Sequence, residues 1–338
     1  MSTAPVHLKK LSLLSLALAA SAGAATPAPA KPPTANAVQT ESDELFRLGQ
    51  LLFDQFAPAD IKAEYEFPTK ARWDAFVTKF QRALAGNSLS DLAACAAEGR
   101  SALKALRMVP GYSDLADWLE QRIDAMEGAQ QIPPAPPRGP APKTPSTPGS
   151  PPRSPTPTAQ PVPHYDVWLA RVRDRPLPAR AESLMPRLRA AFVAEGVPPE
   201  LAWLAEAESS FNPTARSPVG AKGLFQFMPE TAKSMGLATF MPDERTDPDK
   251  SARAAARYLR ALHGRFGNWA LTLAAYNAGE GRVGRTLSSQ KAKTFTAISH
   301  ALPAETQMYV PKVCALITTR TGVAPNQLPP PKPAGVLR

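Results

Sequence analysis

With 338 residues and a formal net charge of +10, the chain is long enough for two modest domains, but its 39 prolines exclude a structure that is compact throughout. Only two cysteines are present, Cys95 and Cys314, which excludes a disulfide framework and a thiolate metal site. We expect two buried thiols rather than one bridge between them. Most of the excess of Lys and Arg lies in residues 164–338, which indicates either an acidic partner or only a solvated basic face.

The first 24 residues are typical of a secretory signal peptide. Lys9 and Lys10 give a positive start, residues 11–20 are apolar, and Ala22-Gly23-Ala24 offers a cleavage site of small residues. The apolar run is shorter than the about 20 residues that cross a bilayer, which disfavours the alternative of an uncleaved anchor. We therefore predict an exported, periplasmic protein with no integral membrane segment after cleavage. For such a protein the anionic cell wall or membrane surface fits the positive charge better than nucleic acid, and we expect no nucleic-acid partner.

Three Pro-rich segments divide the chain, at residues 25–37, 130–163 and 326–338. We expect the first and the last to be disordered. In residues 131–163, 14 of the 33 positions are proline and bulky apolar residues are almost absent, so no core can form there. This linker favours extended polyproline conformations at about 3.1 Å per residue and could hold its flanking domains up to on the order of 100 Å apart.

Residues 38–129 are predicted to form a small helical domain. Apolar residues recur there at helical spacing, at Leu45, Leu48, Leu52 and Phe56 and again at Trp73, Phe76, Val77 and Phe80. Ser113 is expected to cap a last helix that contains Trp118, Leu119, Ile123 and Met126. We find no catalytic pattern in this domain. Its aromatic residues, Tyr112 among them, are expected to be core rather than a platform for sugars.

From His164 onward the apolar pattern stays helical, with no alternating runs that indicate strands. One helix is expected at 184–194, and Pro198-Pro199-Glu200 would open another because proline and a carboxylate suit a first turn. Further helices are expected at 252–262 and 269–276. The last is apolar nearly all round and is predicted to be the central buried helix. The predicted fold class is therefore all-α.

One carboxylate, that of Glu208, stands out in the helix after the two prolines. Apolar residues precede it by seven, four and three positions, which places the carboxylate on the apolar stripe of the helix (Leu201, Leu204 and Ala205). Partial desolvation there disfavours the charged form and raises the pKa, as a general acid near neutral pH requires. From this pattern alone, a buried structural ion pair is the alternative.

Four motifs then follow one another along the chain. The first two are Glu208-Ser-Ser-Phe-Asn-Pro and Gly220-Ala-x-Gly223-Leu-Phe-Gln226. The third is Ala275-Tyr276-Asn277-Ala278-Gly279, and the fourth is Leu302-Pro303-x-Glu305-Thr306-x-x-Tyr309-Val310. Together they resemble the catalytic domain of the soluble lytic transglycosylases (SLT), and most closely the membrane-bound lytic transglycosylase D branch. The resemblance implies a lysozyme-like, goose-type helical fold at 164–325 that acts on the glycan strands of peptidoglycan.

The resemblance also implies roles for seven side chains. Glu208 would be the catalytic acid and base, and the residues that bind substrate would be Ser217, Gln226, Met228, Tyr276, Asn277 and Tyr309. Gln226 would hydrogen-bond an N-acetyl sugar, and Tyr309 would orient the glutamate through its hydroxyl. Each binding residue has a structural alternative. Ser217 and Asn277 could instead be turn residues, and Tyr276 and Tyr309 could instead be core residues. Met228 could instead fill a gap in the core.

A glycosidase normally uses two carboxylates, and the sequence offers no second one. Glu206 lies about 200° round the helix from Glu208 and faces elsewhere. The resemblance implies a lone acid: Glu208 protonates the leaving oxygen while the substrate's acetamido oxygen supports the oxocarbenium-like centre. Glu208 then takes the proton of the muramic acid C6 hydroxyl, and this oxygen closes a 1,6-anhydro ring. No cofactor and no metal are implied.

Two alternatives within this resemblance remain open. A goose-type lysozyme-like hydrolase would pass the intermediate to water, and an inactive wall-binding scaffold would cut nothing.

Members of the D branch often carry a lipidation cysteine and LysM wall-binding repeats, and this sequence shows neither. We therefore expect wall targeting from the basic face or from the helical domain at 38–129, which is also the candidate site for a protein partner.

Overall fold

The computed structural model describes residues 46–47, 50–51, 53–55, 59–64, 66, 69–108, 113–133, 162–217 and 220–332. The predicted signal peptide, residues 25–37 and most of the Pro-rich linker lie outside these residues, as do Leu45, Leu48, Leu52, Phe56 and Tyr112. The described part consists of helices and isolated bridges without a β-strand, which confirms the all-α prediction. None of the described helices is both long and apolar enough to cross a membrane.

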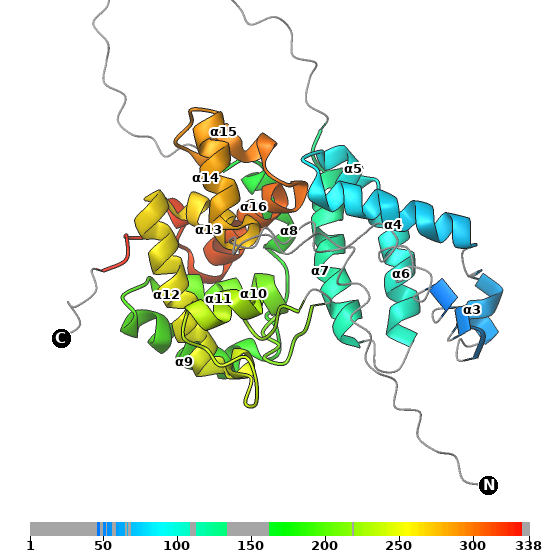
Figure 1. Cartoon of the computed structure of the whole chain (residues 1–338), viewed down its shortest axis with the longest axis horizontal. Coiled ribbons are helices and arrows are strands. Elements are labelled where there is room, and N and C mark those ends of the chain that lie inside the picture. Colours follow the sequence, from blue (N-terminus) through cyan, green and yellow to red (C-terminus); the bar gives the residue numbers. More distant parts are fainter. Residues whose placement is uncertain are drawn as a thin grey trace, which may run out of the picture.

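The N-terminal helices form a small group that is coloured blue to cyan in Figure 1. They are α3 (Ala59–Glu64), α4 (Lys70–Ala85), α5 (Leu89–Ala93), α6 (Ala96–Met108) and α7 (Ser113–Gln130). The side chain of Ser88 caps α5 by accepting a hydrogen bond from Asp91 N at 3.2 Å. The helix expected after Ser113 begins at that residue itself. Trp118 and Ile123 of α7 are buried, which confirms a core role for that tryptophan.

The remaining helices form the larger group, coloured green to red in Figure 1. The α-helices are α8 (Tyr165–Val172), α9 (Ala181–Ala194), α10 (Leu204–Ser209), α11 (Pro229–Ser234), α12 (Pro248–Phe266), α13 (Trp269–Ala278), α14 (Glu280–Ser289), α15 (Phe295–Ile298) and α16 (Ala304–Thr321). Short 3₁₀ helices are η1 (Pro199–Trp203), η2 (Glu244–Thr246), η3 (Ser299–Ala301) and η4 (Pro325–Gln327).

Helices α13 and α16 lie at the centre of this larger group. Asn268 caps α13 by accepting a hydrogen bond from Leu271 N at 3.2 Å, and Gly279 ends the helix at a positive φ of 85°. Most residues of α13 are buried, which confirms the prediction of a central buried helix. In α16 an unbroken run of residues from Thr306 to Ile317 is buried. These two helices therefore form much of the core of the larger group.

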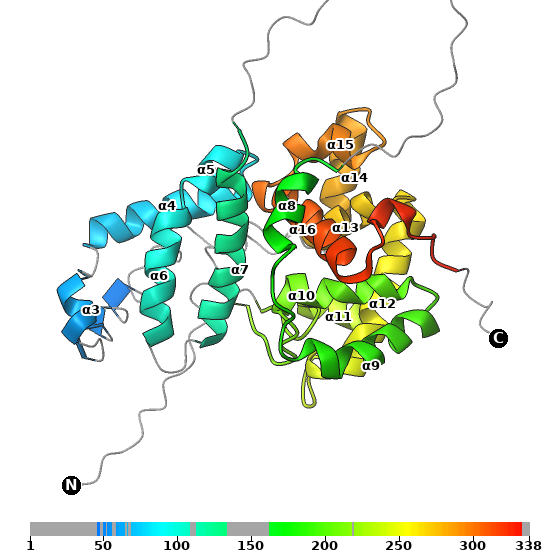
Figure 2. The same cartoon turned by 180° about the vertical axis from the view of Figure 1, so that it is seen from behind.

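The two groups of helices pack directly against each other, through α7 on one side and α8 and α16 on the other (Figure 2). Their buried apolar residues form one continuous core. Gly128 of α7 leaves room for the buried ring of Trp168, since a Cβ there would lie 2.9 Å from the Cζ2 of that ring. The two groups are therefore in contact, well within the greatest separation that the linker would permit. A proline-rich linker limits only the maximum distance between the two groups of helices. The apolar face of α7 is buried by packing against α8 and α16.

The C-terminal Pro-rich segment also differs from the expectation. Leu328 is buried, Trp269 Nε1 donates to Pro329 O at 3.2 Å, and Lys332 N donates to Gly196 O at 2.8 Å. Residues 328–332 are thus bound to the larger group rather than disordered, because backbone carbonyls and one apolar side chain suffice to anchor a segment without regular structure. Cys95 and Cys314 are both buried and unbridged, which confirms the prediction of two buried thiols.

Candidate active site

Glu208 lies at the end of a short helix that begins after the two prolines. The predicted single helix is in fact the 3₁₀ helix η1 followed by α10. Leu201 and Leu204 are fully buried, so the apolar stripe turns inward as predicted and carries the partly buried Glu208 with it. Ser210 and Phe211 adopt positive φ values of 49° and 59°, which end α10 at Ser209, one residue after the glutamate.

The two glutamates of α10 have different surroundings. Glu206 is 4% exposed and meets Arg320 in a bidentate ion pair, with Nη2 at 2.7 Å from Oε1 and Nε at 3.0 Å from Oε2. Among the described residues, no cation lies within ion-pair distance of Glu208, whose carboxyl instead accepts a hydrogen bond from the hydroxyl of Tyr309. The structural ion pair considered for Glu208 is therefore formed by its neighbour.

Burial raises the pKa of Glu208 to about 7, because desolvation penalises the charged form. Several weaker effects act on the same group. The hydrogen bond from Tyr309 and the charges of Arg122 and Lys312 lower the pKa, whereas the charge of Glu305 raises it. Desolvation outweighs the rest, so a large share of the carboxyl groups is protonated at neutral pH. Such a group can donate a proton to a substrate oxygen.

Four hydrogen bonds join the predicted motifs into a closed circuit around Glu208. Ser209 Oγ, beside the glutamate, donates to Leu224 O of the second motif at 2.9 Å. Tyr276 of α13 donates through its hydroxyl to Phe225 O of the same loop at 2.8 Å. The loop that carries the second motif is thus fixed between α10 and α13.

The circuit closes through α16. Thr306 Oγ1 donates to Asn277 Oδ1 of α13 at 2.7 Å, and Tyr309, one turn further along α16, donates to Glu208. The burial of Tyr276 and Tyr309 raises the pKa of each phenol well above its usual value, and the charge of Glu208 adds to this effect. The hydroxyls therefore remain hydrogen-bond donors. The structure thus brings Glu208 and Tyr309 into contact and holds Tyr276 and Asn277 on the adjoining helix.

The other three predicted residues lie on the loop of the second motif. Ser217 Oγ accepts a hydrogen bond from Ala221 N at 2.9 Å, and Gln226 Nε2 donates to Gly223 O at 2.9 Å. Met228 is partly buried where α11 begins. Within the described part of the chain, none of the three bonds directly to Glu208. Gln226 keeps its Oε1 as an acceptor that no described donor meets.

The loop itself is built around Arg245, which is 4% exposed. Its Nη1 donates to Gly220 O at 2.8 Å and to Phe227 O at 3.1 Å, and its Nη2 meets Asp243 Oδ2 at 2.8 Å. Gly223, with a φ of 80°, lies so close that an added Cβ would be 1.8 Å from Arg245 O. A buried guanidinium and one glycine therefore determine the path of the loop.

Three charged residues near Glu208 were not among the predicted site residues. Glu305 and Lys312 lie on α16, and Arg122 lies on α7 of the N-terminal group. Glu305 stands within the fourth motif and one helical turn before Tyr309, a spacing from which its position could have been predicted. For Arg122 the sequence carries no signal, because its position depends on how the two groups of helices dock.

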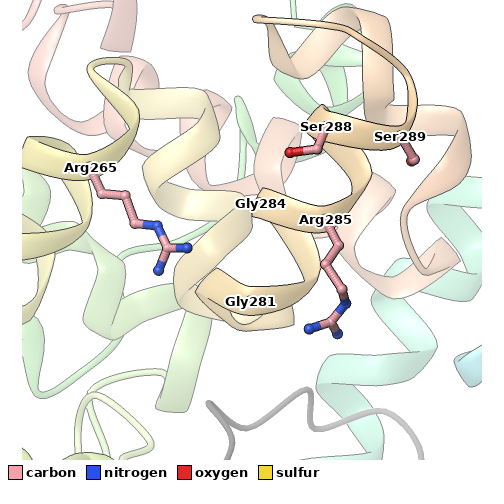
Figure 3. A pocket seen from close by; sticks show the side chains of 6 residues that line it. All are labelled: Arg265, Gly281, Gly284, Arg285, Ser288 and Ser289. Atoms are coloured by element: carbon pink, nitrogen blue, oxygen red, sulfur yellow. The ribbon is translucent and has the colours of Figure 1, made fainter.

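A separate hollow of about 730 Å³ lies over α14. Figure 3 shows Arg265 reaching toward α14 from α12, while Arg285 extends from α14 itself. Arg265 Nη1 is paired with Glu280 Oε2 at 3.1 Å. None of the six residues that line the hollow (Arg265, Gly281, Gly284, Arg285, Ser288 and Ser289) is a predicted site residue, so it does not coincide with the surroundings of Glu208.

Known proteins resemble part of this chain. The chain is 40% identical over 141 residues to the membrane-bound lytic murein transglycosylase D of Escherichia coli (strain K12), which covers 40% of this chain and 31% of that protein. It is 38% identical over 121 residues to the soluble lytic murein transglycosylase of the same strain, covering 33% of this chain and 19% of that protein. The match thus spans less than a third of the length of each relative.

Among solved structures, the complex of the 70-kDa soluble lytic transglycosylase with bulgecin A aligns with a TM-score of 0.40 and 19% identity, over 91% of this chain and 40% of that one. The family model of the transglycosylase SLT domain matches residues 189–299, a range that contains Glu208, Gln226 and Asn277. This range ends before Tyr309 and excludes α7. Residues 189–299 of this chain therefore match the transglycosylase SLT domain family.

Proposed function

We propose that this chain is a peptidoglycan lytic transglycosylase with Glu208 as its only acid and base. One observation carries the proposal: the Glu208 carboxyl is partly buried, bonded to the hydroxyl of Tyr309, and has a pKa raised to about 7. A carboxyl in such surroundings holds a proton at neutral pH and can also release it. The match of residues 189–299 to the SLT family supports the assignment of the substrate class.

In the first proposed step, Glu208 protonates the oxygen of the β-1,4 bond that leaves N-acetylmuramic acid C1. As this bond breaks, the acetamido oxygen of the same sugar supports the positive charge that develops at C1. No second carboxylate is required, which agrees with Glu206 being bound to Arg320. The strand that begins with N-acetylglucosamine leaves with the proton of Glu208 on its freed C4 oxygen.

In the second proposed step, Glu208 is ionised and accepts the proton of the muramic acid C6 hydroxyl. The C6 oxygen then attacks C1 and closes the 1,6-anhydro ring, so the proton returns to the enzyme and no water is consumed. The Tyr309 hydroxyl donates to the carboxylate and stabilises it during this half of the reaction. One side chain thus serves first as acid and then as base.

We assign substrate contacts to the residues that surround this pair. Gln226 Nε2 is used by the backbone, so Oε1 is left to accept the N–H of an N-acetyl group. Asn277 Oδ1 is used by Thr306, so its amide nitrogen is left to donate to a sugar hydroxyl. Ser217, Met228 and Tyr276 are assigned to the lining of the cleft, which completes the set of seven residues.

The proposed function includes export and a division of labour along the chain. Residues 1–24 would direct the chain to the periplasm, where its substrate lies, and residues 164–325 would form the catalytic domain. Residues 38–129 would form the helical domain, joined to the catalytic domain by the Pro-rich segment at 130–163. No transmembrane helix occurs among the described residues, and none is needed for this role.

Mass spectrometry of the products tests the proposal. Purified sacculi are digested with the full chain, and the released muropeptides are expected to end in 1,6-anhydro-N-acetylmuramic acid, one water lighter than the hydrolytic product. Reducing muramic acid ends would instead identify a lysozyme-like hydrolase. Binding to sacculi without any released muropeptide would identify an inactive wall-binding scaffold.

A further inference from the structure

One helix of the N-terminal group reaches the surroundings of Glu208. Arg122 of α7 forms an ion pair with Glu305 of α16, with Nη2 at 3.3 Å from Oε1. The two side chains are 23% and 17% exposed, so the pair is largely withdrawn from water. Glu305 precedes Tyr309 by one helical turn, and Tyr309 donates directly to Glu208. The pair therefore lies beside the catalytic acid proposed above.

A second cluster of charges determines where α7 lies. Asp124 accepts Lys312 Nζ of α16 at 2.8 Å, Arg171 Nη2 of α8 at 3.1 Å and Arg175 Nη2 at 3.0 Å. The Lys312 side chain is only 8% exposed. Three cations from the larger group thus converge on one carboxylate of α7. This arrangement fixes the position of the helix along α16, and with it the position of Arg122.

The charge of Arg122 is only partly balanced by its neighbours. Glu305 meets it through one contact of 3.3 Å, which is longer than a strong charge-assisted hydrogen bond. The guanidinium carbon lies 4.5 Å from the centroid of the Trp118 ring, which holds the side chain in place. Arg122 Nε is buried and has no hydrogen-bond partner among the described residues. Positive charge is therefore available to act on nearby groups.

We propose that the N-terminal helices complete the active site by supplying Arg122 as a positioning residue, whose charge stabilises the ionised form of Glu208. This inference rests on the proposed function, because it assigns Arg122 to the half of the reaction in which Glu208 acts as a base. It also gives the helical domain a role that does not depend on another protein. Residues 162–332 by themselves would then be an incomplete enzyme.

The groups around Glu208 determine the sign of the expected effect. The cations Arg122 and Lys312 favour the carboxylate, Glu305 opposes it, and the phenols of Tyr276 and Tyr309 remain neutral. Loss of the charge of Arg122 removes one of the two cations and leaves Glu305 without its partner. Both changes raise the pKa of Glu208. Undocking of α7 would instead admit water to Glu208 and lower its pKa, so the direction of the shift separates the two explanations.

A carboxyl ¹³C NMR titration of Glu208 in the full chain tests the inference, with the signal assigned by its loss in Glu208→Gln. In Arg122→Gln the midpoint is expected to move up by about one pH unit, and in Glu305→Gln it is expected to move down. Arg122→Lys should restore most of the wild-type value. The matched control is Arg107→Gln, whose arginine pairs with Asp117 and Glu120 on the surface of the N-terminal helices and should leave the midpoint unchanged.

An unchanged or lowered midpoint in Arg122→Gln, measured on protein that unfolds at the wild-type temperature, would overturn the inference. The alkaline limb of the pH–rate profile should move in the same direction as the midpoint, and kcat should fall about tenfold with little change in KM. The NMR midpoint can be measured whether or not the protein is active. Failure of the proposed function, seen as wild-type protein that releases no anhydro-muropeptides, is therefore distinguishable from failure of this inference.

Discussion

At the scale of single residues, two glutamates of one short helix show how surroundings determine chemistry. Glu206 is bonded through both oxygens to Arg320, which compensates the loss of water around its charge. Glu208 has a phenol as its nearest partner and loses water without gaining a cation in contact. The pKa of Glu208 is consequently raised to about 7. The two carboxyl groups lie two residues apart on the same helix, yet an arginine pairs with one of them, whereas the other takes up a proton near neutral pH.

The raised pKa of Glu208 predicts a pH-dependent stability. The ordinary value is 4.5 and the folded value is about 7, so the folded protein holds this proton more tightly than the unfolded chain. Protonated Glu208 makes its full contribution to the stability of the folded protein below about pH 4.5. This contribution is lost as the pH rises through about 7. Once ionised, the group costs the folded state on the order of 3 kcal/mol.

Glu208→Gln keeps the side chain neutral and removes this cost. We expect the variant to unfold at nearly the same denaturant concentration as the wild type at pH 4.5, and to be the more stable of the two at pH 8. Urea titrations at a series of pH values measure the difference. A stability difference that stays constant over this range would show that the pKa of Glu208 is not raised in the folded protein.

Much of the chemistry at this scale could be predicted from the sequence. The spacing of Glu208 behind three apolar residues predicts a partly dry carboxylate, and the structure confirms it. The contact of Tyr309 with that carboxylate followed from the resemblance of the fourth motif and not from spacing. The ion pair of Glu206 could not be predicted, because Arg320 lies more than 100 positions away and nothing local marks it as the partner.

At the scale of elements, the loop at 215–228 connects Glu208 to α13. Its described residues make several backbone hydrogen bonds with one another, including the two across the isolated bridge between Lys222 and Phe227. Arg245 adds to this organisation, because its guanidinium donates hydrogen bonds to two carbonyls of the loop. The close approach of Gly223 to the backbone of Arg245 further restricts the path of the loop.

Gly223→Ala is expected to disturb this contact strongly. The added Cβ would overlap Arg245 O, and φ at this position is 80°. We expect a loss of about 3 kcal/mol or more in the free energy of unfolding, because the loop must shift away from Arg245. Gly220→Ala is the matched control. Its φ is 89°, but no atom of the described residues lies within 4 Å of the added Cβ, so its cost should be only about 1 kcal/mol.

Chemical denaturation of both variants measures these costs, and the release of muropeptides shows whether the loop still holds substrate. Equal losses of stability in the two variants would mean that backbone strain alone matters and that the close approach to Arg245 is not restrictive. That both glycines adopt backbone conformations unfavourable for other residues could be expected from the sequence. Which of the two lies against another segment depends on tertiary packing that the local pattern does not contain.

At the scale of the whole molecule, the N-terminal helices and the larger group share one core. Docking is anchored by Asp124, whose pKa is lowered because Lys312 and Arg175 favour its charged form despite burial. Backbone contacts add to it, with Ala304 N donating to Gly86 O at 2.8 Å and Gln307 Nε2 to Asn87 O at 2.8 Å. Ion pairs from α7 and hydrogen bonds to the turn between α4 and α5 together fix the N-terminal helices against α16.

Asp124→Ala is expected to destabilise the protein by about 3 kcal/mol or more, because it leaves three cations, one of them 8% exposed, without their shared partner. Asp117→Ala removes an ion pair of similar length at a side chain that is 43% exposed, and should cost less than about 1 kcal/mol. Thermal unfolding followed by circular dichroism compares the two. If they lose the same stability, the cluster around Asp124 does not hold the groups together.

The arrangement at this scale could be predicted least. Helical spacing gave the all-α class and the existence of both groups, since each depends on patterns within about twenty residues. The linker composition could set only the greatest distance between them. The docking of α7 depends on side chains from α8 and α16. The binding of residues 328–332 depends on the indole N–H of Trp269 and on the carbonyl of Gly196, so neither arrangement is visible in a local pattern.

The release of muropeptides by Glu208→Gln tests the central claim most directly, with Glu206→Gln as the control from the same helix. All three proteins are incubated with purified sacculi below the lowest unfolding temperature. We predict that Glu208→Gln releases anhydro-muropeptides about 1,000-fold more slowly than the wild type, while Glu206→Gln stays within about tenfold. Undiminished release by Glu208→Gln, or an equal loss in Glu206→Gln, would contradict the assignment of Glu208 as the acid.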